Sequence, residues 1–324
     1  MITTDDLRNK LGRLGYPETQ FPALADELNA IRRLAEERDA IILAHNYQSP
    51  EILLIADFIG DSLELARAAT KVAHQRILFA GVHFMAETAK ILNPEKIVLL
   101  PNRAAGCSLA DTADDADVAE RIEELRCIHP NLGSVAYVNT TAAVKALVDV
   151  CCTSSNAVKI VDSLDHDPIL FLPDRNLAAY VASKTKKTII AWEGSCYVHQ
   201  EITRAQIAAY RDADPELAIL VHPECRADVQ ELADAVCSTS GMVEAAKTSP
   251  KRKFLIVTEC GLSDRLEMEV PGKQFFRSCK LCRFMKANTL ADIRYALEKD
   301  QFEIVLSQEV AAGARRSLER MLAA

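Results

Sequence analysis

The chain lacks any apolar stretch approaching the roughly 20 residues that a membrane-spanning helix needs. Its first residues, from Met1 to Arg13, are polar and charged and do not resemble a signal peptide. We therefore expect a protein without membrane segments that works in the cytoplasm.

Basic runs interleaved with aromatic residues are also missing, and the net charge is -8 at pH 7. This balance argues against nucleic-acid binding, so an anionic substrate has to be held by local groups. Glycine is scarce, with 11 residues in 324, and no linker or low-complexity segment divides the chain. The repeated units described below are therefore expected to pack as one rigid body.

Cysteine is plentiful, with ten residues. In a reducing compartment, cysteines serve as metal ligands, catalytic groups or core residues more often than as disulfides. Three of them, Cys107, Cys196 and Cys282, recur at one position of three weakly similar stretches, at spacings of 89 and 86 residues. Three thiolates can hold an iron-sulfur cluster and leave one iron open, whereas electron-carrying clusters normally take four protein ligands. The pattern predicts Lewis-acid chemistry.

The three stretches share a strand that ends in a polar residue and a second short strand that contains an aspartate. The first strands are expected at residues 40–45, 134–139 and 217–222, and the aspartates are Asp57, Asp149 and Asp234. Each apolar run followed by a helical pattern is typical of a buried parallel strand. Five residues after each aspartate stands a hydroxyl residue that we predict to be a helix N-cap. These residues are Ser62, Ser154 and Thr239.

A further strand is expected in each unit, at residues 77–80, 169–172 and 254–257, whereas the third unit lacks an obvious final strand before Cys282. The alternation predicts an α/β fold of three pseudo-threefold related αβα units with small parallel sheets. We divide the chain into a first unit with a helical preamble (1–108), a second unit (109–196) and a third unit with C-terminal helices (197–324). Ligands bind at the carboxyl ends of such strands. His45, Asn139 and His222 stand there, so the active site is expected at the common centre.

Ten ordered motifs resemble those of the iron-sulfur dependent, type A quinolinate synthase family. They are Ala44-His-Asn-Tyr-Gln48, Gly60-Asp-Ser62, Ala105-Gly-Cys-Ser-Leu-Ala-Asp111, Tyr137-Val-Asn-Thr140, Cys152-Thr-Ser-Ser-Asn-Ala157, Pro173-Asp-Arg-Asn-Leu177, Trp192-Glu-Gly-Ser-Cys196 with Val198-His199, His222-Pro-Glu-Cys225, Ser238-Thr-Ser-Gly-Met242, and Cys282 with Met285-Lys286 and Asn288-Thr-Leu290. The resemblance runs from the first predicted strand to the last helices.

This resemblance implies a 4Fe-4S cluster held by Cys107, Cys196 and Cys282. It also implies condensation of iminoaspartate with dihydroxyacetone phosphate to quinolinate, phosphate and two waters, as a step of NAD biosynthesis. A transient contact with an aspartate-oxidising enzyme, the source of the unstable imine, stays open.

The resemblance also assigns roles to matching positions. His45 and Tyr47 would contact substrate and shuttle protons, and Tyr137 would lie close to the open iron. His222 would hold a carboxylate, and Glu224 would act as a general base. The remaining positions would bind substrate phosphate or carboxylates, and they are Ser62, Asn139, Ser154 and Thr239.

The other cysteines have a simpler interpretation as small apolar core residues. They are Cys127, Cys151, Cys152, Cys225, Cys237 and Cys260. Cys279 stands three residues before Cys282, so either thiol could reach the cluster, and the family pattern favours Cys282. A disulfide between these two would withdraw a cluster ligand and switch activity off. His199 is a candidate for the surroundings of the cluster.

The remaining histidines are predicted to be structural or surface residues. They are His74, His83, His129 and His166.

Two alternatives from other classes stay open. One is a structural zinc site formed by Cys279, Cys282 and two further thiols, with the repeats as a binding scaffold. The other is a thiol redox protein that uses Cys279 and Cys282 as a reversible disulfide. That pair lacks the strand-to-helix setting of a thioredoxin motif.

Overall fold

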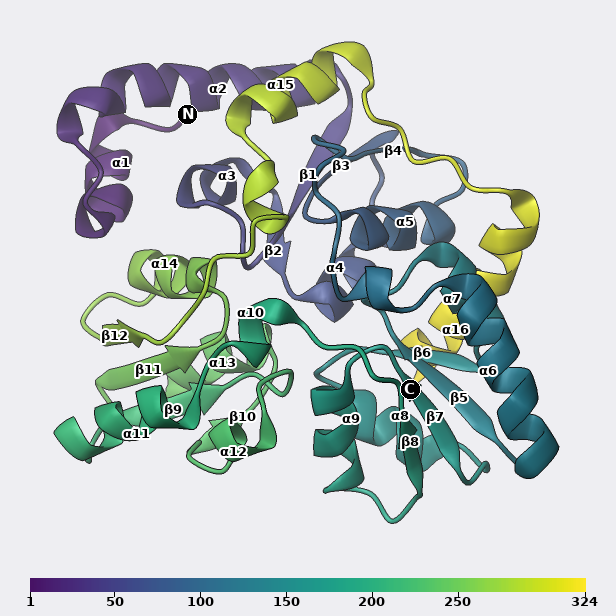
Figure 1. Ribbon diagram of the computed structural model, residues 1–324. Helices are drawn as coiled ribbons and strands as arrows, with labels where there is room; N and C mark the ends of the chain where they lie inside the picture. The colour runs from purple at the N-terminus through teal and green to yellow at the C-terminus, as the bar shows by residue number, and fades with distance from the viewer.

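The structure, a computed structural model, describes residues 1–324 and contains three sheets of four parallel strands each. The strand orders β2-β1-β3-β4, β6-β5-β7-β8 and β10-β9-β11-β12 repeat one topology. Figure 1 shows the sheets as three separate units, each flanked by helices. The predicted fold class is confirmed.

The strands of the first sheet are β1 (Ala40–His45), β2 (Phe58–Gly60), β3 (Arg76–Ala80) and β4 (Ile97–Leu99). Those of the second sheet are β5 (Gly133–Tyr137), β6 (Val150–Cys152), β7 (Ile169–Leu172) and β8 (Ile189–Ala191). Those of the third sheet are β9 (Ala218–Val221), β10 (Ala235–Val236), β11 (Lys253–Val257) and β12 (Gln274–Arg277). The central strands β5, β7 and β9 are buried along their whole length, as expected for parallel strands covered on both faces.

The helices up to the second sheet are α1 (Thr4–Leu11), α2 (Phe21–Glu37), α3 (Pro50–Ile55), α4 (Ser62–Ala69), α5 (His83–Leu92) and α6 (Asp115–Ile128). Those of the second and third units are α7 (Ala142–Leu147), α8 (Ala157–Ser163), α9 (Arg175–Ala182), α10 (Tyr197–Gln200), α11 (Arg204–Ala213), α12 (Ala227–Gln230), α13 (Thr239–Thr248) and α14 (Cys260–Glu269). The last two are α15 (Leu290–Lys299) and α16 (Gln308–Ala323). Short 3-10 turns are η1 (Gly12–Leu14), η2 (Glu18–Gln20), η3 (Ala110–Thr112) and η4 (Met285–Ala287).

The repeated aspartates lie just before the second strand of each unit, not inside it as predicted. Asp57 precedes β2, and its carboxylate accepts the backbone amide of Ile42 in β1 at 2.8 Å. The same bond joins Asp149 to Ser134 N at 2.8 Å and Asp234 to Ile219 N at 2.7 Å. The recurring aspartates therefore have a structural role. Each carboxylate joins the start of the second strand to the first strand, away from the carboxyl ends where the site lies.

The hydroxyl residues are not N-caps, which corrects the prediction. Asp61 caps α4 and Ser238 caps α13, each one residue earlier, and Asn156 precedes α8 two residues after Ser154. The side chain of Asp61 accepts the amides of Leu63 and Glu64. Side chains of other residues cap α4 and α13, and α8 has no side-chain cap, so the predicted hydroxyl groups are not engaged as caps.

The third unit has a final strand that the sequence did not reveal. β12 pairs in parallel with β11, from Gln274 opposite Lys253 to Arg277 opposite Ile256. Only Phe275 of β12 is buried, so this edge strand lacks the apolar run that marked the inner strands.

The predicted helical segments at both ends of the chain are confirmed. Gly15 interrupts the first segment with φ 82°, in the left-handed region that favours glycine. α15 lies beside α2, and α16 packs against α7 and β6 of the second unit (Figure 1). The boundaries at residues 108/109 and 196/197 stay a prediction.

None of the helices has the length and apolarity required to cross a membrane.

Candidate active site

The three recurring cysteines sit in loops that are built in the same way. A backbone amide at the start of a helix donates to the carbonyl two residues before each cysteine. The pairs are His83 N to Ala105 O at 2.8 Å, Arg175 N to Gly194 O at 2.8 Å, and Cys260 N to Lys280 O at 3.3 Å. Each cysteine loop is therefore hydrogen-bonded to the helix that follows the third strand of its own unit. This arrangement places one thiol per unit at the centre.

All site residues predicted from the sequence line one cavity. These are His45, Tyr47, Ser62, Cys107, Tyr137, Asn139, Ser154, Cys196, His222, Glu224, Thr239 and Cys282. His45 ends β1 and His222 directly follows β9, so the carboxyl ends of the sheets do meet here. The buried Oδ1 of Asn139 has no hydrogen-bond partner and is free to accept from a ligand.

His45 and His222 share one orientation. Nδ1 of His45 accepts the amide of Tyr47 at 3.2 Å, and Nδ1 of His222 accepts the amide of Glu224 at 3.4 Å. Since Nδ1 is the acceptor, Nε2 carries the proton and each ring offers one N–H donor. Burial lowers the pKa of each imidazole to about 3, so both rings are neutral at pH 7.

This depressed pKa makes the stability of the fold acid-sensitive. Below about pH 6.5 an unfolded His45 binds a proton that the folded ring refuses until about pH 3, so the free energy of unfolding falls as the pH falls. For each pH unit below 6.5, we expect the free energy of unfolding of His45→Asn to fall by about 1.4 kcal/mol less than that of the wild type. Urea unfolding at several pH values below 6.5 measures it. His129→Asn, outside the cavity, should keep the wild-type slope, and an equal slope in His45→Asn would contradict the assignment.

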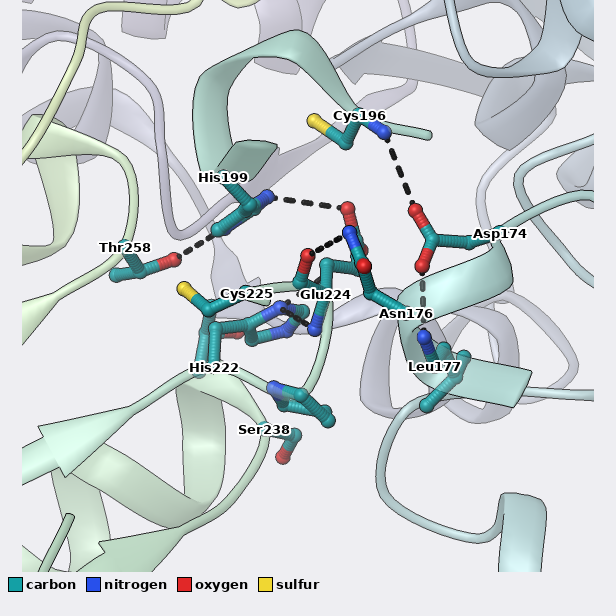
Figure 2. A network of polar contacts seen from close by, with 12 residues as sticks. Asp174, Asn176, Leu177, Cys196, His199, His222, Glu224, Cys225, Ser238 and Thr258 are labelled. Carbon is teal, nitrogen blue, oxygen red and sulfur yellow. Dashed lines mark hydrogen bonds and ion pairs between the residues drawn. The ribbon is translucent and has the colours of Figure 1, made fainter. Parts of the chain in front are cut away.

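A chain of polar contacts crosses the cavity wall and joins both tyrosines. The hydroxyl of Tyr47 lies 2.5 Å from Thr258 Oγ1, which lies 2.8 Å from Nε2 of His199. Nδ1 of His199 lies 3.1 Å from Oε2 of Glu224, as an ion pair off the line of a straight hydrogen bond (Figure 2). Tyr137 donates its hydroxyl to Oε1 of Glu224 at 2.6 Å. These groups form a path of close polar contacts between units, in which the contact of His199 Nδ1 with Glu224 is the one link without hydrogen-bond geometry.

The ionisation states suit such a path. Burial raises the pKa of Glu224, but His199, His222 and the hydroxyl of Tyr137 outweigh it, so the net pKa lies below its usual value and the carboxylate is charged. Burial and then this charge raise the pKa of Tyr47 and Tyr137 well above the ordinary value, so both phenols keep their protons. Glu224 is thus a charged carboxylate that accepts from the protonated hydroxyl group of Tyr137.

A family model described as quinolinate synthetase A protein matches residues 29–323 of this chain. The chain belongs to the quinolinate synthetase A family. A quinolinate synthase of Methanoregula boonei is 49% identical over 90% of this chain and 96% of the relative. Those of Xylella fastidiosa (strain Temecula1) and Sinorhizobium fredii are 48% and 46% identical, over 92% and 94% of this chain and 87% and 84% of the relatives. The motif resemblance is confirmed, and with it membership of an enzyme family of NAD biosynthesis.

This quinolinate synthetase A chain carries one disulfide, and it is not the pair of Cys279 and Cys282 considered as a possible switch. Cys279 is bonded to Cys260, with 5.1 Å between the Cα atoms, and Cys282 is free. The Cys260 amide already holds the loop at Lys280, which brings the two cysteines together. The disulfide therefore leaves Cys282 in the cavity instead of withdrawing it. The zinc site with Cys279 as ligand is wrong for the same reason, and so is the interpretation of Cys260 as a core residue.

The other cysteines follow the prediction of core residues only in part. Cys151, Cys152 and Cys225 are buried, Cys237 is half-buried against the main core, and Cys127 is exposed. Cys127 lies on the outer face of α6, whose buried residues are Val118, Ile122 and Leu125. Of the histidines predicted to be structural or surface residues, none lines the cavity.

Several residues that complete the site were missed. Thr258 directly follows β11, a strand-end position like that of His222, and this was the available signal. The hydroxyl group of Thr239 accepts from the side-chain amide of Asn46 at 2.7 Å, and Arg265 donates to the oxygen of the same amide. Asn46 and Arg265 therefore orient the hydroxyl group of Thr239. Glu259 lines the cavity as well.

Ligand atoms able to hold a metal ion do gather here. Those of Cys196, His199 and Glu224 lie within 4.8 Å of one another. The free thiols of Cys107 and Cys282 line the same cavity. The residues present are thus consistent with a metal cofactor.

Proposed function

We propose that this chain is a quinolinate synthase that condenses iminoaspartate with dihydroxyacetone phosphate to quinolinate, phosphate and two waters, in de novo NAD biosynthesis. The observation that carries the proposal is the single cavity in which three thiols, one from each unit, face the polar ends of the central strands. The relatives named quinolinate synthase support it.

The thiols of Cys107, Cys196 and Cys282 would hold a 4Fe-4S cluster. Burial raises the pKa of all three, that of Cys107 to about 12, so thiolates here need a positively charged partner such as iron. The backbone amides two and three residues further along partly offset this rise in the pKa of Cys107 and of Cys282, and amides that face sulfur are typical of iron-sulfur sites. When bound, the cluster supplies a Lewis acid at the iron without a protein ligand.

The polar groups opposite the thiols would bind the two anionic substrates. His45 and His222 each offer an Nε2–H donor from a neutral ring, suited to a carboxylate oxygen. Asn139 offers an unpaired Oδ1, and the hydroxyl groups of Ser62, Ser154 and Thr239 line the same cavity. We assign these hydroxyl groups to phosphate and carboxylate oxygens.

The tyrosine and glutamate residues would move protons during the dehydrations. Glu224 is the proton acceptor because it is charged and buried, and Tyr137 returns a proton through its hydroxyl group. Tyr47 is a second proton donor, and its hydroxyl group is reprotonated through Thr258 and His199. The compartment we propose is the cytoplasm, where thiols that hold iron stay reduced. A transient contact with an aspartate-oxidising enzyme would deliver the unstable imine.

The test is an anaerobic preparation examined for iron, sulfide and visible absorption, then assayed with dihydroxyacetone phosphate and freshly generated iminoaspartate. We expect about four irons per chain, as a cubane cluster requires, and quinolinate formation. Cys107→Ala should lose both, whereas Cys127→Ala, with its exposed thiol, should keep both. A colourless wild-type protein that forms no quinolinate after cluster reconstitution would overturn the proposal.

A further inference from the structure

Two buried carboxylates occupy the same place in the second and third units, next to the cysteine loops. Asp174 lies at the start of α9 and Glu259 at the start of α14, both two residues beyond the third strand of their sheets. Both are fully buried. Asp174 stands within the motif Pro173–Leu177 but was given no role there, and Glu259 lies outside the motifs.

In the second unit, Asp174 joins the helix to the cysteine. Its Oδ1 accepts the amide of Leu177 at 2.7 Å, and its Oδ2 accepts the amide of Cys196 at 3.1 Å. Figure 2 shows the carboxylate between these two amides. One side chain thus caps α9 and fixes the backbone of Cys196 at the same time.

In the third unit, Glu259 makes the same connection with a longer side chain. Its Oε2 accepts the amide of Gly261 at 2.6 Å, and its Oε1 accepts the amide of Cys282 at 3.0 Å. Nζ of Lys286 lies 3.4 Å from Oε1. A Cβ added at Gly261 would lie 2.8 Å from this carboxylate and 2.6 Å from the carbonyl oxygen of Tyr47, so the close approach depends on glycine.

The first unit breaks the pattern. Val82 stands at the corresponding position before α5 and makes no side-chain cap, although the bond from His83 N to Ala105 O is kept. The loop of Cys107 therefore lacks a carboxylate that joins the helix to the cysteine. It is held by the backbone bond and by Asn102, whose side chain accepts the amide of Ala104 at 2.9 Å and donates to the carbonyl of Ala287 at 3.0 Å.

Helix capping alone does not account for these carboxylates. A buried charge loses several kcal/mol of hydration, and a neutral serine, threonine or asparagine caps a helix as well. A carboxylate offers two acceptor oxygens, and here each oxygen serves a different element. Fixing the amide of a cysteine fixes the direction of its Cα–Cβ bond, and with it the place of the sulfur.

We propose that Asp174 and Glu259 are positioning residues that hold the thiols of Cys196 and Cys282 in place for the iron-sulfur cluster, while Cys107 is positioned without such a carboxylate. This inference rests on the cluster assigned above. Replacing either carboxylate by its amide keeps the shape but turns one acceptor into a donor, so one of the two amide bonds is lost.

The experiment measures how fast the holoenzyme loses iron to a chelator, together with the midpoint potential of the cluster and the melting temperature of the cluster-free protein. We expect Asp174→Asn and Glu259→Gln to lose iron about 10- to 100-fold faster than wild type, the usual effect of removing a group that supports a metal ligand. The midpoint potential should shift as well, because hydrogen bonds and charge near the sulfurs set it. Asp114→Asn makes the same exchange at the exposed cap of α6, away from the cysteine loops, and should change neither quantity.

The outcomes separate the inference from the function. A lower melting temperature without faster iron loss or a shifted potential would mean that the carboxylates are only helix caps, and the inference would be wrong. Wild-type protein that binds no 4Fe-4S cluster would overturn both the cluster assignment and this inference. Val82→Ala should lose iron at the wild-type rate, because Val82 binds no cysteine loop through its side chain. If Val82→Ala lost iron as fast as Asp174→Asn, the proposed difference between the first unit and the other two would be wrong.

Discussion

Glu224→Gln is expected to lower the turnover of quinolinate formation by about 10²- to 10⁴-fold, the usual contribution of a general acid or base. Glutamine has nearly the same shape, but it carries no charge and cannot take up a proton. It also removes the anion that faces His199 at 3.1 Å and accepts from Tyr137 at 2.6 Å. The chemical step, measured as single-turnover quinolinate formation, should slow accordingly.

A matched control separates the chemistry from the loss of a buried charge. Glu87 is also a buried carboxylate and accepts the amide of Ala142 at 2.9 Å, but it does not line the cavity. Glu87→Gln should therefore change stability more than turnover. Iron content must stay at the wild-type level in Glu224→Gln. Full turnover in that variant would show that Glu224 does not act as the base.

The repeat made the centre of this fold predictable. Cys107, Cys196 and Cys282 recur once per unit, and strand ends such as His45 and His222 follow apolar runs that sequence patterns reveal. Parallel strands of like topology bring their carboxyl ends to one edge, so the cavity follows from the order of elements.

What the sequence did not reveal depends on contacts between distant segments. The partner of Cys279 is Cys260, 19 residues away, because the loop doubles back on the start of α14. Asp174 and Glu259 were missed because a carboxylate before a helix is expected to cap it, and the second bond to a cysteine amide appears only in three dimensions. β12 was missed because an edge strand buries a single side chain and shows no apolar run.

The site needs all three units at once. Tyr47 follows β1 of the first sheet, Tyr137 ends β5 of the second, and Thr258 follows β11 of the third. The hydroxyl groups of Tyr47 and Tyr137 both contact side chains of the third unit, Thr258 and Glu224. No single unit could therefore hold the path or the thiol triad.

Thr258→Val is expected to break the link between Tyr47 and His199, which runs through the hydroxyl group of Thr258. Turnover should fall by roughly 10²-fold or more, because Tyr47 can then no longer be reprotonated. Valine keeps the shape of threonine but has no hydroxyl group, so the buried Tyr47 hydroxyl and His199 Nε2 lose the partners now at 2.5 Å and 2.8 Å. Each buried polar group left without a partner costs about 1–3 kcal/mol, so the free energy of unfolding should fall too.

Thr258→Ser is the matched control for this variant, because it restores the hydroxyl group and loses only a methyl group. We expect it to recover most of the turnover, and a solvent isotope effect on the chemical step should be present in Thr258→Ser and altered in Thr258→Val. Turnover that falls equally in both variants would mean that the methyl group and packing matter here. Wild-type turnover in Thr258→Val would show that protons reach Tyr47 by another route, since Thr258 Oγ1 is the only hydrogen-bond partner of the Tyr47 hydroxyl in the structure.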